Sequence, residues 1–152
     1  MSAARRHELA LDLPAVHRGV RVARHVVRHF ARLEGVGDRE IEQLVLIVSE
    51  LLANAIDHCG NGKPAMTEHD LDGDPRMKLS LVVGDVEWRL SVSDEGGGDP
   101  TRVRNALRSA QLPDLEDERG RGFFLMSAMV DELKVDRSSD GKGLTFTAVK
   151  RS

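Results

Sequence analysis

Apolar and polar residues alternate over residues 7–13, and this period of two predicts a short strand close to the N-terminus. Over residues 15–33 the apolar positions instead recur at steps of three and four, as they do along one face of a helix. Gly35 and Gly37 interrupt this pattern before a second helical pattern begins over residues 38–58, whose first residue, an aspartate, is a favourable N-cap. The first part of the chain is therefore predicted to form a strand and two helices.

Strand-like patterns dominate the rest of the chain. Residues 77–83 and 86–93 are rich in apolar and β-branched side chains, and the Gly84–Asp85 dipeptide between them is typical of a hairpin turn. Composition further predicts three loops, at 60–75, at 96–100, which is rich in glycine, and at 113–119, which is acidic. A short helix is predicted at 101–112 and an apolar helix at 123–130. The last two predicted strands, 132–136 and 144–150, are joined by a turn at 138–143. This order predicts an α+β protein, a two-layer α/β sandwich with helices on one face of a mostly antiparallel, mixed sheet.

Composition narrows the class of protein. A chain of 152 residues with 40% hydrophobic residues is long enough for one domain with its own core. The single cysteine, Cys59, rules out an intramolecular disulfide and favours a reducing, cytoplasmic environment. No apolar run approaches the roughly 20 residues that a membrane span needs. A net charge of −3 and only 3% aromatic residues argue against a dedicated nucleic-acid-binding protein.

The second predicted helix carries the first chemical signal. Glu50, Asn54 and Asp57 follow one another at steps of four and three, so they share a face opposite the apolar face. Such a stripe is most often exposed to solvent, but here Glu50 is the only charged residue between Gln43 and Ile56. A narrow polar stripe bordered by apolar residues indicates a covered site. A carboxylate and a carboxamide one turn apart can serve as general base and as magnesium ligand.

Two glycine-containing segments carry the second signal. Asp94 follows a predicted strand directly and precedes Gly96 and Gly98, where backbone can approach a ligand closely. Its carboxylate could accept a hydrogen bond from an exocyclic amine, or the segment could be a tight turn with a solvated aspartate. Residues 120–122 precede an apolar helix and could cradle a phosphate, or could simply be a flexible connection. Thr145 on the last strand could add a polar contact.

The order of these signals is more specific than any one of them. They are Glu50-x-x-x-Asn54-x-x-x-His58, then Asp94-x-Gly96-x-Gly98, then Gly120-x-Gly122, then Gly143 with Thr145. This succession resembles the Bergerat ATP-binding fold of the GHKL superfamily, which includes gyrase, heat-shock chaperone, histidine-kinase and mismatch-repair ATPases, and it spans nearly two thirds of the chain. The size and the N-terminal strand-helix-helix order resemble the stand-alone serine/threonine kinases that act as anti-sigma factors in bacteria.

The resemblance implies a single histidine-kinase-like ATP-binding domain over residues 1–152, with ATP and Mg²⁺ as cofactors. Glu50 would be the catalytic base that activates a substrate hydroxyl, and Asn54 would hold Mg²⁺. Asp94 would accept a hydrogen bond from the adenine amino group, supported by Thr145. The implied positions that shape the loop around the base or contact phosphates are Gly96, Gly98, Gly120, Arg121 and Gly122.

The resemblance also implies a function and its partners. The protein would phosphorylate an anti-anti-sigma (STAS-type) antagonist on serine or threonine and would sequester a sigma factor in the cytoplasm, without direct contact to nucleic acid or membrane. One alternative is a non-catalytic module in which ATP only gates protein binding. A further alternative is a fold that has lost nucleotide binding altogether.

The first predicted helix offers a candidate partner surface. Its basic residues lie opposite its apolar face: Arg18, Arg21, Arg24, His25, Arg28, His29 and Arg32. The ordinary explanation is a solvent-exposed helix face. The more specific interpretation is a docking surface for an acidic partner or for a second copy of the chain, and the resemblance favours a sigma factor or a homodimer contact.

Overall fold

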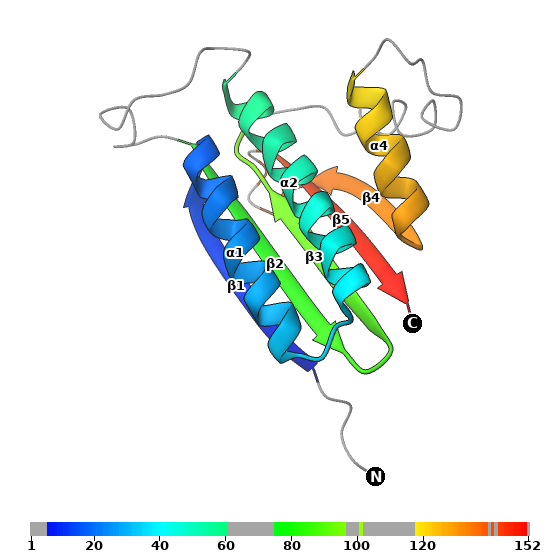
Figure 1. Ribbon diagram of the computed structural model, residues 1–152. Coiled ribbons are helices and arrows are strands. Elements are labelled where there is room, and N and C mark those ends of the chain that lie inside the picture. The colour runs from blue at the N-terminus through cyan, green and yellow to red at the C-terminus, as the bar shows by residue number, and fades with distance from the viewer. Residues whose placement is uncertain are drawn as a thin grey trace.

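A computed structural model describes residues 6–60, 75–96, 101, 118–139, 141 and 143–151. The described chain forms two layers, with a sheet behind and helices in front of it (Figure 1). In chain order the elements are β1 (Arg6–Pro14), α1 (His17–Leu33), α2 (Asp38–Gly60), β2 (Arg76–Gly84), β3 (Glu87–Ser93), α4 (Glu118–Met129), β4 (Glu132–Arg137) and β5 (Leu144–Arg151). None of the described helices is long and apolar enough to cross a membrane.

The sheet has the strand order β1-β2-β3-β5-β4, and all four of its pairings are antiparallel. The predicted α+β architecture, with helices on one face of a mostly antiparallel sheet, is therefore confirmed, and the described sheet contains no parallel pair. The β2–β3 hairpin forms as expected, with Val83 opposite Trp88. Strand β1 pairs with β2 along its whole length and forms one edge of the sheet, while β4 forms the other.

Side chains on the strands alternate between a buried and an open face, because successive residues of a strand point to opposite sides. The apolar residues that face the helices are fully or almost fully buried: Met77, Leu79, Leu81, Leu90, Val92, Leu144, Phe146 and Ala148. The buried apolar arc of α2 completes this core from the other layer: Ile41, Leu44, Val45, Ile47, Val48, Leu51, Leu52 and Ala55. Hydroxyl side chains line the open face of the sheet, where Ser93 and Thr145 are hydrogen-bonded at 2.8 Å.

All three described helices start at a different residue from the prediction, and α1 begins at His17 rather than at residue 15. Asp38 lies in the first turn of α2 rather than before it, because the Ile41 N–H already bonds the Gly37 carbonyl at 2.9 Å. Helix α4 begins at Glu118, so Gly120 and Gly122 lie in its first turns and do not precede it. The helix can include both glycines because a glycine inside a helix costs only about 1 kcal/mol relative to alanine.

Several predicted segments cannot be compared with the structure. The loop at 60–75, the helix at 101–112 and the acidic loop at 113–119 lie almost entirely outside the described residues. Of the glycine-rich loop at 96–100, the structure describes only Gly96. The turn at 138–143 is described in part and is closed by a hydrogen bond from the Ser138 N–H to the Gly143 carbonyl at 2.8 Å.

Candidate functional site

Helix α2 lies between α1 and α4 on the helical face of the sheet (Figure 1). The side of α2 that faces α1 is marked by an ion pair between Arg28 and Glu42. Ile47, Glu50 and Asn54 lie at steps of three and four along the opposite border of the buried arc. This border faces away from α1 and toward the α4 side of the molecule.

The three polar residues that share one face of α2 differ in how far they are buried. Glu50 and Asn54 are half-buried, and Ile47 beside them is fully buried. Asp57, by contrast, is exposed. The carboxylate and the carboxamide therefore lie together at the edge of the core. Asp57 behaves as an ordinary solvent-exposed residue.

Asp94 is a buried carboxylate at the end of β3, with only 3% of its surface exposed. It points to the same side of the sheet as Val92, which is the helical side. Its Oδ1 atom accepts hydrogen bonds from the Gly96 N–H at 2.9 Å and from the Leu144 N–H at 3.2 Å. These bonds from two separate segments fix the orientation of the carboxylate, which is an acceptor when ionised.

The β4–β5 turn is packed directly against Asp94. A Cβ atom on Gly143 would lie within 3.0 Å of the Asp94 backbone oxygen and of its Oδ1 atom, so only glycine fits without a shift. Gly143 is held in turn by Ser138, a buried residue whose Oγ atom accepts a hydrogen bond from the Gly143 N–H at 3.0 Å. The position of the carboxylate thus depends on a turn about fifty residues further along the chain.

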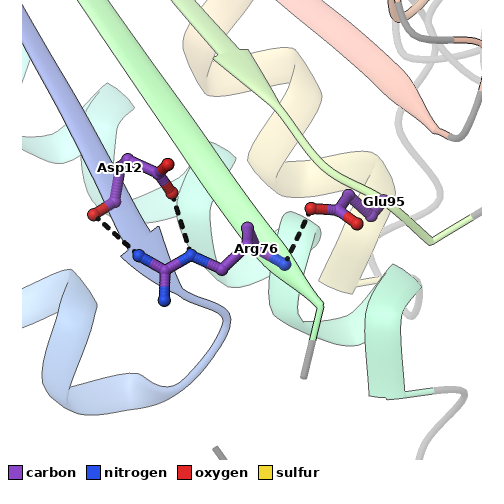
Figure 2. A network of polar contacts seen from close by, with 3 residues as sticks. All are labelled: Asp12, Arg76 and Glu95. Carbon is purple, nitrogen blue, oxygen red and sulfur yellow. Dashed lines mark hydrogen bonds and ion pairs between the residues drawn. The ribbon is translucent and has the colours of Figure 1, made fainter. Parts of the chain in front are cut away.

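Glu95, the next residue, connects the end of β3 to two other elements. Figure 2 shows its Oε1 atom accepting a hydrogen bond from the Arg76 N–H, at 3.3 Å, while the Arg76 guanidinium holds Asp12 of β1. Burial raises the pKa of the Cys59 thiol at the end of α2, a hydrogen bond from the Glu95 backbone lowers it, and the nearby Asp94 and Glu95 carboxylates raise it. The ends of α2 and β3 and the start of β2 therefore meet at Glu95.

The structure does not bring Thr145 to the Asp94 carboxylate. Thr145 lies on the open face of the sheet, where it bonds Ser93, whereas Asp94 points to the helical face. The neighbouring Leu144 contacts this carboxylate through its backbone N–H.

The remaining predicted site residues are placed only in part. Gly96 lies next to Asp94 and bonds its side chain, and Gly98 lies outside the described residues. The backbone of residues 120–122 belongs to α4, and the side chain of Arg121 is not among those described.

Sequence reasoning missed four residues that support Asp94. Gly143 was noted only as part of a motif, and nothing in the sequence showed its close approach to the carboxylate. Ser138 and Arg76 gave no signal, because both act through contacts between segments far apart in the chain. Glu95 had one usable signal, its place between Asp94 and Gly96.

The described chain also has a hollow of about 330 Å³ on the open face of the sheet. Its lining residues come from β1, β2 and β3: Ala10, Leu11, Asp12, Lys78, Leu79, Ser80, Ser91 and Ser93. Glu50, Asn54 and the Asp94 carboxylate belong to the opposite, helical face. The hollow is therefore separate from the candidate site.

The basic face of α1 is exposed, as predicted. Its exposed members are Arg18, Arg21, Arg24, His25, His29 and Arg32. Arg28 is the exception, since it is half-buried and pairs with Glu42 of α2.

Comparison with protein families gives a match over most of the chain. The model of the histidine kinase-like ATPase domain matches residues 13–148. An anti-sigma F factor of Geobacillus stearothermophilus is 32% identical over 143 residues, covering 92% of this chain and 89% of that protein. A serine-protein kinase RsbW of Bacillus pumilus is 27% identical over 147 residues, covering 93% of this chain and 84% of that protein.

Solved structures agree on the fold. The RsbU and RsbW domains of a Mycobacterium tuberculosis protein give a TM-score of 0.63 at 20% identity, covering 95% of this chain and 32% of that longer chain. A chain of the SiaB-SiaC complex from Pseudomonas aeruginosa gives a TM-score of 0.65 at 16% identity, covering 95% of this chain and 89% of that chain. At these identities the likeness concerns the fold alone.

Proposed function

This chain belongs to the histidine kinase-like ATPase domain family, and from that premise we propose that it is an ATP-dependent serine/threonine protein kinase that also acts as an anti-sigma factor. The observation that carries the kinase activity is the half-buried pair of Glu50 and Asn54 on one side of α2. The names of the relatives, serine-protein kinase RsbW and anti-sigma F factor, support both parts of the proposal.

In this proposal Asp94 recognises the base of ATP. Its carboxylate accepts a hydrogen bond from the adenine amino group, and the bonds from Gly96 and Leu144 hold it ready to do so. A preorganised acceptor of this kind binds more tightly than a mobile one, because less freedom is lost on binding.

Asn54 is the proposed ligand of Mg²⁺. The half-buried carboxamide offers one oxygen, and Mg²⁺ in nucleotide sites takes only one or two protein oxygens together with phosphates and water. When bound, the ion would neutralise phosphate charge. The residues present on α2 are compatible with that role.

Glu50 is the proposed general base. It takes the proton of a serine or threonine hydroxyl while that oxygen forms a bond to the γ-phosphorus of ATP. The bond between the γ-phosphorus and the β–γ bridging oxygen breaks, and ADP leaves. The products are a phosphoserine or phosphothreonine and ADP, with the proton on Glu50.

The proposed phosphate acceptor is an anti-anti-sigma (STAS-type) protein. The protein that this chain is proposed to sequester is a sigma factor, and both partners are placed in the cytoplasm. Phosphorylation would release the antagonist and leave this protein free to hold the sigma factor. The exposed basic face of α1 is a candidate surface for one of these partners or for a second copy of the chain.

The test is transfer of label from γ-labelled ATP to candidate antagonists. Glu50→Gln should lower the rate by about 10²–10⁴-fold, the usual cost of losing a general base, while Mg-ATP still binds. Asp57→Asn is the matched control, since it removes an exposed carboxylate from the same helix, and it should transfer label at the wild-type rate. Label transfer that survives Glu50→Gln would exclude this role. Mg-ATP binding that changes partner affinity without any transfer would instead favour the gated binding module.

A further inference from the structure

Glu95 attaches the end of β3 to β2 through its side chain and to the end of α2 through its backbone. The register of β2 and β3 pairs Lys78 with Ser93, and extending it by two residues sets Arg76 opposite Glu95. Arg76 is the first residue of β2, but β3 ends at Ser93, and the Glu95 side chain closes this last pair by accepting the Arg76 N–H. The sheet is thus extended by one side-chain contact at the edge of the candidate site.

The contact matters because Asp94, Glu95 and Gly96 form a single turn. The bond from the Gly96 N–H to Asp94 Oδ1 spans two residues, as in an Asx-turn, and Glu95 is its middle residue. Its backbone also contacts the Cys59 sulfur at the end of α2. Holding Glu95 therefore limits how far the turn, and the Asp94 carboxylate with it, can move.

We propose that Glu95 is a positioning residue for the nucleotide, and that Arg76, braced by Asp12, extends this anchor to edge strand β1. The Arg76 guanidinium donates from Nε to Asp12 Oδ1 at 2.9 Å and from Nη2 to the Asp12 carbonyl at 3.2 Å, so the first residue of β2 is held from both sides (Figure 2). Glu95 acts through Asp94 and does not itself touch the reacting groups. The role rests on the proposed function, because it concerns the binding of ATP.

The first test compares Glu95→Ala with Glu95→Gln by calorimetry with Mg-ATP and by kinase kinetics. Alanine removes the acceptor, and we expect ATP affinity to fall by about three- to tenfold, the range for one lost hydrogen bond. Glutamine keeps an oxygen in the same place and should restore most of the affinity. KM for ATP should rise in the alanine variant with kcat unchanged, since Glu50 is untouched. A residue that only stabilised the fold would not produce this split.

The second test uses β1. Asp12→Ala removes the brace on Arg76 and should weaken ATP binding by about twofold, a small effect because the pair is exposed. Glu8→Ala is the matched control, since Glu8 is also an exposed carboxylate of β1 and bonds a β2 side chain, Ser80, at 2.9 Å. Equal affinities in these two variants would overturn the brace.

A third readout does not need nucleotide. Cys59 is the only cysteine in the chain, so its alkylation rate reports on the junction at Glu95 without further mutation. Both Glu95 variants lose the same negative charge, so the comparison isolates the lost hydrogen bond. Faster labelling of the alanine variant would support the anchor, and equal rates would overturn it.

The outcome of Mg-ATP calorimetry separates this role from the proposed function. If the wild type binds Mg-ATP and Glu95→Ala binds it with the same affinity, only the positioning role is overturned. A wild type that gives no heat with Mg-ATP would overturn the proposed function and this role together.

Discussion

Replacing Gly143 by alanine tests how tightly the Asp94 carboxylate is held. The substitution adds a single methyl group, and the three nearest atoms to its Cβ would be the backbone oxygen, Oδ1 and backbone carbon of Asp94, all within 3.0 Å. Two of these atoms belong to the backbone, which cannot rotate out of the way as a flexible side-chain end could. Either the β4–β5 turn or the end of β3 must therefore move.

The expected cost follows from two effects. Inserting a methyl group into a packed region typically costs about 1–3 kcal/mol. A shift at this point also stretches the hydrogen bond from the Leu144 N–H to Asp94 Oδ1, and a bond to a charged group contributes about 1.5–3 kcal/mol. Because the turn can relax in part, we expect a total of about 2–4 kcal/mol in the free energy of unfolding. ATP affinity should fall at least about tenfold, since the carboxylate loses its orientation.

Urea denaturation and Mg-ATP calorimetry measure the two effects separately. Gly141→Ala is the matched control in the same turn: its φ of 74° is unfavourable for alanine, but nothing lies within 4 Å of the new Cβ. That variant should lose about 1–2 kcal/mol of stability through backbone strain and keep its ATP affinity. The reasoning is refuted if Gly143→Ala unfolds at the wild-type urea concentration and binds ATP as the wild type does, or if both variants lose ATP affinity equally.

Two further substitutions test the core and the thiol. Glu40→Ala removes the acceptor of the Trp88 Nε1–H, which bonds Glu40 at 2.9 Å, and should lower the free energy of unfolding in urea by about 1–3 kcal/mol. Glu42→Ala is the control, because it removes only the ion pair with Arg28, and it should cost less than about 1 kcal/mol. Equal losses in the two variants would contradict the argument. Burial raises the pKa of the Cys59 thiol, so the unfolded chain releases this proton at a lower pH than the folded chain does. The free energy of unfolding should therefore decline as the pH rises from the ordinary thiol pKa through the raised one. Cys59→Ala should flatten that alkaline decline in a series of denaturation curves, and an equally steep decline would show that other groups cause it.

The order of elements could be predicted because each of them repeats its own hydrophobic period. The strands show alternation and the long helices show steps of three and four, and both patterns depend only on residues close together in the chain. The start of α4 could not be predicted in the same way. Its first turns contain Gly120 and Gly122, which carry no side chain to pack, so the apolar pattern begins only after the helix has begun.

The residues of the candidate site also differ in whether a local sequence pattern or a long-range contact positions them. Glu50 and Asn54 were found together because helix geometry alone fixes their relative position. Thr145 was expected to support Asp94 at the adenine, and the alternation with buried Leu144 and Phe146 places its side chain on the other side of the sheet from the Asp94 carboxylate. The contacts of Gly143 depend on the pairing of β3 with β5, and no local pattern reveals that register.

These two ways of building a site have different consequences for mutation. Glu50 and Asn54 keep their spacing as long as α2 stays helical, so changes in the sheet should leave the proposed proton-transfer step intact. The Asp94 carboxylate instead depends on contacts from the segment after β3 and from the β4–β5 turn. Substitutions that disturb the contact of Gly143 with Asp94 should therefore raise KM for ATP while kcat is preserved, and substitution of Glu50 should do the reverse. In the proposed mechanism, base recognition and phosphoryl transfer should therefore be separable, because the first depends on tertiary contacts and the second on a single helix.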